Sequence, residues 1–397
     1  MVALVAVFLV RDGRHEVDTG PLDVRRASPG DAAAVLSAFA AAVGDRDPDA
    51  LAALAPSGDD QAARVLAGVA RNVEAAHLTG VGARYVDQVG VVAADGSWSG
   101  VVEMTWQVDG FDRMPSAADV IVDFAPDGAD LAIAGFGGTE PGSRTPLWLH
   151  GELAVATAPG VLVMVDGSAA AAEVVARRAV RGVAVVRRVL SGWTTPVVVE
   201  VPGSAADLDA ALGADPGTYA GVAAVTATAG SSTDPGAPVH VFVNPEVTAG
   251  LRRAGAQVVM SHELVHVATD AVRTPMEPWL LEGFADYVAL RGTRLPDPVT
   301  LGRAIAAARR NGVPRTLPTA ADFDTRARDL QARYEEAWLA CRVIAERLGE
   351  RGLVGVYRDA AAGQHITSAL ARAGLSERAL TWTWRNRLAG FVVDALQ

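Results

Sequence analysis

Residues Val258–Ala268 read V-V-M-S-H-E-L-V-H-V-A, and the organisation of the whole chain follows from this stretch. The segment from Gln257 to Arg273 lacks glycine and proline and is rich in apolar residues, which predicts a buried helix. On a helix, His262 and His266 project from one face with Cβ atoms about 6 Å apart. That spacing allows two imidazoles to bind one tetrahedral Zn²⁺ ion, while Glu263 accepts a proton from a coordinated water.

Zinc needs a third protein ligand, and the segment Pro278–Tyr287, P-W-L-L-E-G-F-A-D-Y, offers one. Its apolar residues recur at helical spacing, and Glu282 lies on the expected helix. Asp286 shares the face of Glu282, where its carboxylate could hold a ligand imidazole in one orientation. Two rival third ligands are Asp270, expected to be exposed near the helix end, and Glu277, expected in a proline-flanked turn.

The alternative to a metal site is coincidence, with two core histidines four positions apart and each satisfied by hydrogen bonds. The chain has seven histidines in 397 residues. A chance H-E-x-x-H is therefore rare, on the order of one per cent for the whole sequence. The downstream pair of carboxylates, Glu282 and Asp286, favours the metal-site interpretation.

The motif H-E-L-V-H followed by W-L-L-E-G-F-A-D-Y resembles the gluzincin metallopeptidases, the group that contains thermolysin and aminopeptidase N. It is most similar to the peptidase MA-like domains of bacterial extracytoplasmic proteins. The resemblance implies that His262, His266 and Glu282 bind one Zn²⁺ ion, that Glu263 is the general base, and that Asp286 supports a ligand histidine. The loop between the two helices is shorter than in thermolysin. The metzincin pattern, with a glycine and a third histidine after the second one, is absent.

The resemblance also suggests where substrate and oxyanion would lie. Tyr334, in A-R-Y-E-E-A-W, loosely matches a tyrosine that lies over the cleft in this family and could stabilise an oxyanion. The alternative is a tyrosine that anchors its helix to the core, and His365 is a lesser candidate for the same role. In gluzincins the strand ahead of the active-site helix is an exposed edge that pairs with an extended peptide, which places substrate along Val239–Asn244. His240 within that strand is expected at the surface.

Composition narrows the function classes. The net charge of −11 argues against nucleic-acid binding, because no basic cluster could neutralise phosphates. One cysteine, Cys341, excludes an intrachain disulfide framework and is expected in a helical core. Half of the residues are hydrophobic, as in a well-packed globular protein.

The first ten residues, M-V-A-L-V-A-V-F-L-V, are apolar and lead into a polar, breaker-rich stretch that ends at Pro29. Ten residues are too few to span a bilayer, which needs about 20, and a basic n-region is missing. We interpret residues 1–29 as the remnant of a membrane anchor with its linker. A buried β-strand is the alternative.

Residues 30–140 are expected to form a small α+β domain similar to NTF2-like or cystatin-like folds. Its helices come first, with Asp31 and Asp47 as N-caps, and a meander of strands follows. Four polar residues are expected on a solvated face rather than in a site: Glu103, Asp109, Asp112 and Arg113. Gly137–Thr145 reads as a linker. Residues 146–397 are expected to form a zincin-like domain with a mixed sheet, the H-E-x-x-H helix and a C-terminal helical bundle.

The sequence therefore predicts an α+β extracytoplasmic protein, membrane-anchored or secreted, that hydrolyses a peptide or protein substrate with one zinc ion. One alternative is a weakly active or inactive zinc-binding module that binds a cell-envelope partner; the intact Glu263 argues against it. Another is a zinc-free scaffold, which the Glu282–Asp286 pair disfavours. Cleavage specificity and oligomeric state stay open.

Overall fold

The computed structural model describes residues 27–138, 140–324 and 327–394. The expected anchor remnant of residues 1–29 falls almost wholly outside this part of the chain. Within it, no helix is both long enough and apolar enough to cross a bilayer.

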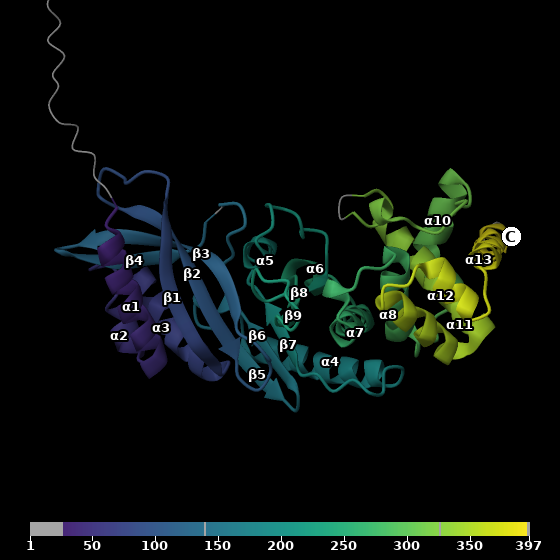
Figure 1. Ribbon diagram of the computed structural model, residues 1–397, viewed down its shortest axis with the longest axis horizontal. Coiled ribbons are helices and arrows are strands. Elements are labelled where there is room, and N and C mark those ends of the chain that lie inside the picture. Colours follow the sequence, from purple (N-terminus) through teal and green to yellow (C-terminus); the bar gives the residue numbers. More distant parts are fainter. Residues whose placement is uncertain (1–26, 139, 325–326, 395–397) are drawn as a thin grey trace, which may run out of the picture.

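The N-terminal unit consists of three helices followed by an antiparallel sheet (Figure 1). The helices are α1 (Pro29–Asp45), α2 (Pro48–Ala52) and α3 (Asp60–Ala75). Asp47 caps α2 through the backbone N–H groups of Asp49 and Ala50, as predicted. The prediction that Asp31 caps the first helix is wrong. Ser28 accepts the backbone N–H of Asp31, and the helix begins at Pro29, which suits a first turn.

The sheet of this unit is a four-stranded meander in the order β1-β2-β3-β4. Its strands are β1 (Leu78–Val89), β2 (Trp98–Val108), β3 (Ser116–Asp127) and β4 (Asp130–Phe136). Every second residue of β2 is buried, because side chains alternate between the two faces of a strand. The buried residues, among them Trp98, Met104 and Trp106, join a core formed with the three helices.

The second sheet is mixed and has five strands in the order β5-β6-β7-β9-β8. Its strands are β5 (Ala154–Ala158), β6 (Val161–Val165), β7 (Val197–Val201), β8 (Ala224–Thr228) and β9 (Val239–Val243). β6, β7 and β9 are parallel, and β5 and β8 pair antiparallel at the two edges. The prediction that the strand of residues 239–244 is an edge is therefore wrong. β9 is paired on both sides, with β7 and with β8. The edge strand is β8, which precedes β9 in the chain and pairs antiparallel with it.

The second sheet belongs to two cores. Leu162, Met164 and Val198 on one face pack into the core of the N-terminal unit, together with the 3₁₀ helix η1 (Leu147–Leu149). On the other face, the valines that alternate with them pack against α4 (Ala169–Arg187) and α7 (Arg253–Thr269). The two parts of the chain thus share one layer of strands.

Helices make up the rest of the chain. α5 (Ala205–Leu212) and α6 (Pro245–Ala249) flank the second sheet. Beyond α7 and η2 (Ala271–Arg273) come α8 (Pro278–Leu290), α9 (Asp297–Thr300), α10 (Gly302–Asn311), η3 (Ala320–Phe323), α11 (Leu330–Ala361), α12 (Ile366–Arg372) and α13 (Glu377–Asp394). α11 is kinked at Gly349, whose φ of 73° is left-handed.

The contact between α8 and α11 is very close. A Cβ atom on Gly283 would lie 2.3 Å from the carbonyl oxygen of Ala337, so only glycine fits there. Cys341 is buried at the same contact, as expected for a core residue. With helices before a meander and helices around a mixed sheet, the expected α+β class is confirmed.

Candidate metal centre

Helix α7 carries both histidines of the predicted site on one face. It runs as one helix from Arg253 to Thr269, and its residues Met260, Leu264 and Val265 are buried in the core. The imidazoles of His262 and His266 lie edge to face, with ring centroids 4.7 Å apart. Packing of the apolar face therefore directs the two imidazoles toward α8.

The two Nε2 atoms and one carboxylate oxygen of Glu282 converge on a common point. The Nε2 atoms lie 3.0 Å apart, and Oε2 of Glu282 lies 3.1 Å from Nε2 of His262 and 3.5 Å from Nε2 of His266. Ligand bonds of 2.0–2.1 Å in a tetrahedral zinc site place neighbouring ligand atoms about 3.3 Å apart. The three residues therefore fit a zinc ion.

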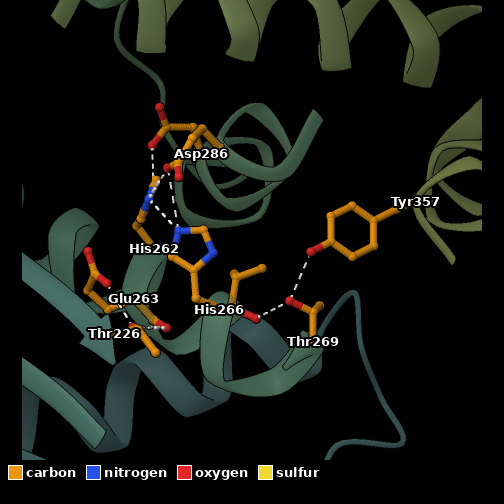
Figure 2. Close-up of polar contacts among 9 residues, drawn as sticks. Thr226, His262, Glu263, His266, Thr269, Asp286 and Tyr357 are labelled. Atoms are coloured by element: carbon orange, nitrogen blue, oxygen red, sulfur yellow. Dashed lines mark hydrogen bonds and ion pairs between the residues drawn. The ribbon is translucent and has the colours of Figure 1, made fainter. Parts of the chain in front are cut away.

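Asp286 lies behind His262, as predicted. Its Oδ1 is 2.8 Å from Nδ1 of His262, one helical turn after Glu282 on α8 (Figure 2). Because a carboxylate can only accept, Nδ1 carries the proton in this contact, and the Nε2 lone pair of a neutral ring faces the cluster. Nδ1 of His266 is buried and has no hydrogen-bond partner among the described residues.

The close contact of imidazoles and carboxylates shifts their pKa values. Burial lowers the pKa of His262, but the charges and hydrogen bonds of Asp286 and Glu282 outweigh it and raise the pKa well above its ordinary value. Burial raises the pKa of Glu282, and the two imidazoles more than reverse this and lower it. Without a cation, the cluster would therefore hold a proton on His262; a divalent cation would take that place.

Glu263 is buried on the side of α7 that faces the second sheet. The hydroxyl of Thr226, on edge strand β8, donates to Oε2 of Glu263 at 2.8 Å and lies 3.1 Å from its carbonyl oxygen. Figure 2 shows Glu263 turned toward Thr226 on one side of the histidines, with Thr269 and Tyr357 on the other. The carboxylate is thus held in one position beside the cluster. Thr226 gave no sequence signal, because its contact depends on strand order.

Tyr334 lies at the cluster, in α11. Its ring meets that of His262 edge to face, with centroids 6.1 Å apart, and packs against Phe323. Burial and the charges of nearby Glu282, Glu263 and Asp286 raise the pKa of Tyr334, which keeps the phenol protonated.

The other candidates have different roles. His365 is exposed and accepts the backbone N–H of Thr367 as the N-cap of α12. Asp270 ends α7 in a left-handed conformation and pairs with Arg273, and Glu277 is an exposed residue at the start of α8. Asp270 and Glu277, the two alternative third ligands, therefore lie outside the group of His262, His266 and Glu282.

Two sequence predictions about polar residues are wrong. His240 is not at the surface but 1% exposed, and Asp112 is not on a solvated face. Asp112, from the loop after β2, lies 3.1 Å from Nε2 of His240, and Glu200 on β7 lies 2.7 Å from Nδ1. The packing of the N-terminal unit on the second sheet buries both residues. Glu103, by contrast, is half-exposed and pairs with Arg84.

Comparison of the chain with family models, with curated proteins and with solved structures found no match.

Proposed function

We propose that the chain is a zinc-dependent metallopeptidase of the gluzincin type, with His262, His266 and Glu282 as zinc ligands. The observation that supports this most strongly is the convergence of two imidazole nitrogens and one carboxylate oxygen, with separations of 3.0, 3.1 and 3.5 Å. Three protein ligands leave a fourth position open, as in catalytic zinc sites.

Each residue around the metal would have a separate role in hydrolysis. Zinc held there would polarise the scissile carbonyl and lower the pKa of a coordinated water. Glu263, held by Thr226, would take the proton of the attacking water and transfer it to the leaving amine. The protonated phenol of Tyr334 would donate a hydrogen bond to the developing oxyanion. Asp286 would keep His262 in the tautomer that offers Nε2 as a ligand.

An extended substrate would pair with the outer edge of β8, because that strand has no other strand on this side among the described residues. β8 contacts α7, and its Thr226 contacts Glu263. A peptide along β8 would therefore run past the carboxylate that is proposed to act as general base.

Zinc content and peptidase activity test the proposal together. We expect Glu282→Ala to lower the bound zinc by about one ion per chain. We expect Glu263→Gln to retain zinc but to lower kcat on a peptide library by a factor on the order of 10²–10⁴.

The matched control is Glu173→Gln, an exposed carboxylate on α4 that pairs with Arg177, which should change neither quantity. Zinc content unchanged in Glu282→Ala would contradict the proposed ligand set. Normal zinc content with no cleavage of any peptide by the wild type would favour the inactive binding module instead.

A further inference from the structure

A second group of metal-binding side chains lies away from α7, where the N-terminal unit meets the second sheet. His150 follows η1, Asp166 follows β6, and Asp207 lies in the first turn of α5. One ring nitrogen of His150 and one oxygen of each carboxylate all lie within 4.8 Å of one another. Among the described residues, only this group and the His262–His266–Glu282 group bring three such side chains together.

One buried atom of this cluster lacks a partner, whereas Asp166 is exposed to solvent. Nε2 of His150 has almost no contact with solvent and no hydrogen-bond partner within the described ranges. A buried polar atom of this kind normally has a partner, whether protein, water or ion. Neither Asp166 nor Asp207 pairs with an arginine in the described part of the chain, although the two carboxylates lie side by side. A cation would give these three groups one shared partner.

The backbone around the cluster makes room for both carboxylates. A Cβ atom on Gly203 would lie 2.7 Å from Oδ2 of Asp166 and 3.3 Å from Oδ2 of Asp207. Glycine at this position therefore allows the two side chains to approach each other over the bare backbone. Oδ2 of Asp207 also accepts the hydroxyl of Ser204 at 2.7 Å, which leaves Oδ1 free for another partner.

The segment that carries His150 is held firmly. Asn72, buried on α3, donates to the carbonyl oxygens of Trp148 and Gly151 and accepts the backbone N–H of Leu153. These three hydrogen bonds fix the backbone on both sides of His150. The imidazole is thus presented at the cluster from a rigid support, as a ligand residue has to be.

We propose that His150, Asp166 and Asp207 bind a second divalent metal ion of the zinc type. The imidazole selects against Mg²⁺ and Ca²⁺, which prefer oxygen ligands alone, whereas Zn²⁺ and Co²⁺ accept nitrogen and carboxylate together. Three ligands leave a position open. His150 and Asp166 also line a cavity of about 340 Å³ between α3, β4 and η1, so these two side chains lie next to open space.

The ion would add a link between three segments, of which the residues before η1 and α5 are already joined by the hydrogen bond from Thr145 N–H to the carbonyl oxygen of Ala210. η1 belongs to the core of the N-terminal unit, whereas β6 and α5 belong to the second sheet and its cover. This site shares no residue with the α7 cluster and does not rest on the peptidase proposal.

The test is a Co²⁺ titration of full-length protein in which His262→Ala and Glu282→Ala remove the first site. We expect about one Co²⁺ per chain in this background, measured by calorimetry and by visible absorption. In this background, His150→Ala, or Asp166→Asn together with Asp207→Asn, should weaken Co²⁺ binding by at least about 10- to 100-fold. That is the effect of losing a residue that only hydrogen-bonds to a metal ligand, and loss of a ligand itself should cost no less. Circular dichroism checks that each variant is folded.

Gly203→Ala tests the geometry without removing a ligand, because φ at Gly203 is not left-handed and only space is lost. We expect weaker Co²⁺ binding, while the control Gly221→Ala, with no atom within 4 Å of its Cβ position, should bind normally. No Co²⁺ binding in the background protein, or equal binding by the His150→Ala variant, would overturn the proposal. Either result leaves the peptidase proposal untouched, because its ligands are already absent from the background.

Discussion

At the scale of single residues, the partners of a histidine decide what its imidazole can do. In His240 both ring nitrogens face carboxylates, so both carry protons. The ring nitrogens of His262 also face carboxylates, Asp286 and Glu282, but Nε2 of His266 lies 3.0 Å from Nε2 of His262, so three potential ligand atoms meet there. The same residue type is thus a buried cation in one place and a potential ligand in the other.

Tyr334 gives a prediction at this scale. We expect Tyr334→Phe to lower kcat by a factor of about 10²–10³ with little change in KM, because the phenol would contact the oxyanion and not the ground state. Steady-state kinetics on one good peptide substrate measures both. Tyr85→Phe, in the N-terminal sheet, is the control. If the kcat of Tyr334→Phe equals that of the wild type, Tyr334 instead serves to anchor α11 to the core.

At the scale of elements, the edge strand β8 packs against helix α7 and positions a side chain of that helix. Strand order decides this, because β8 lies outermost and brings Thr226 against Glu263. The neighbouring Thr228 on the same strand is buried and instead donates to the carbonyl oxygen of Gly230. Thr226 therefore hydrogen-bonds to the proposed base, whereas Thr228, two positions later, hydrogen-bonds to the turn after the strand.

Thr226→Val should lower kcat by roughly tenfold with zinc retained, since it removes a hydrogen bond to a carboxylate worth about 1.5 kcal/mol. The pH profile of kcat should also move, because the environment of the proposed base changes; a purely structural threonine would leave that profile in place. Thr228→Val is the matched control and should affect thermal stability more than the pH profile. Identical pH profiles for both variants and wild type would refute a positioning role for Thr226.

At the scale of the whole molecule, a buried set of charges joins the two parts of the chain. Asp112 comes from the N-terminal unit, and His240 and Glu200 come from the second sheet. Arg144, in the connection between them, donates to the carbonyl oxygen at the end of β8. Burial alone would lower the pKa of His240, but the two carboxylates raise it to about 10. The N-terminal unit is therefore fixed against the sheet on which α7, the helix of the candidate site, packs.

This contact predicts a pH-dependent stability. The folded pKa of His240, about 10, exceeds the unfolded value of about 6.5, so its contribution is complete below about pH 6.5 and is lost as pH rises toward 10. His240→Leu leaves two buried carboxylates without a cation and should cost about 3–5 kcal/mol of unfolding free energy at pH 6. Urea unfolding of wild type and variant at pH 6 and pH 10 measures the difference, which should shrink at the higher pH.

Asp109→Asn, an exposed neighbour of Asp112 in the same loop, should leave stability unchanged at both pH values. A difference between wild type and His240→Leu that is the same at pH 6 and pH 10 would show that loss of packing, and not loss of charge, is what destabilises the variant.

Much of the architecture was predictable from local patterns. The meander of strands after the first helices was expected and is observed, and Asp47 followed by proline marked the start of α2 correctly. The N-cap of α1 was missed because both Ser28 and Asp31 are good caps, and Pro29 decided between them. The edge position of β8 was missed because sequence order says nothing about which of two successive strands is inserted next to β7.

The sequence by itself determined that a helix carries His262 and His266, although the helix spans residues 253–269 and not 257–273, and it determined the spacing of these histidines and of the following carboxylates, because both depend on helical periodicity alone. Only the tertiary structure decided that Thr226 holds Glu263, that His240 is buried between Asp112 and Glu200, and that His150 meets Asp166 and Asp207. Each of these contacts joins segments far apart in the chain, and their meeting depends on strand order and on the packing of two units around one sheet.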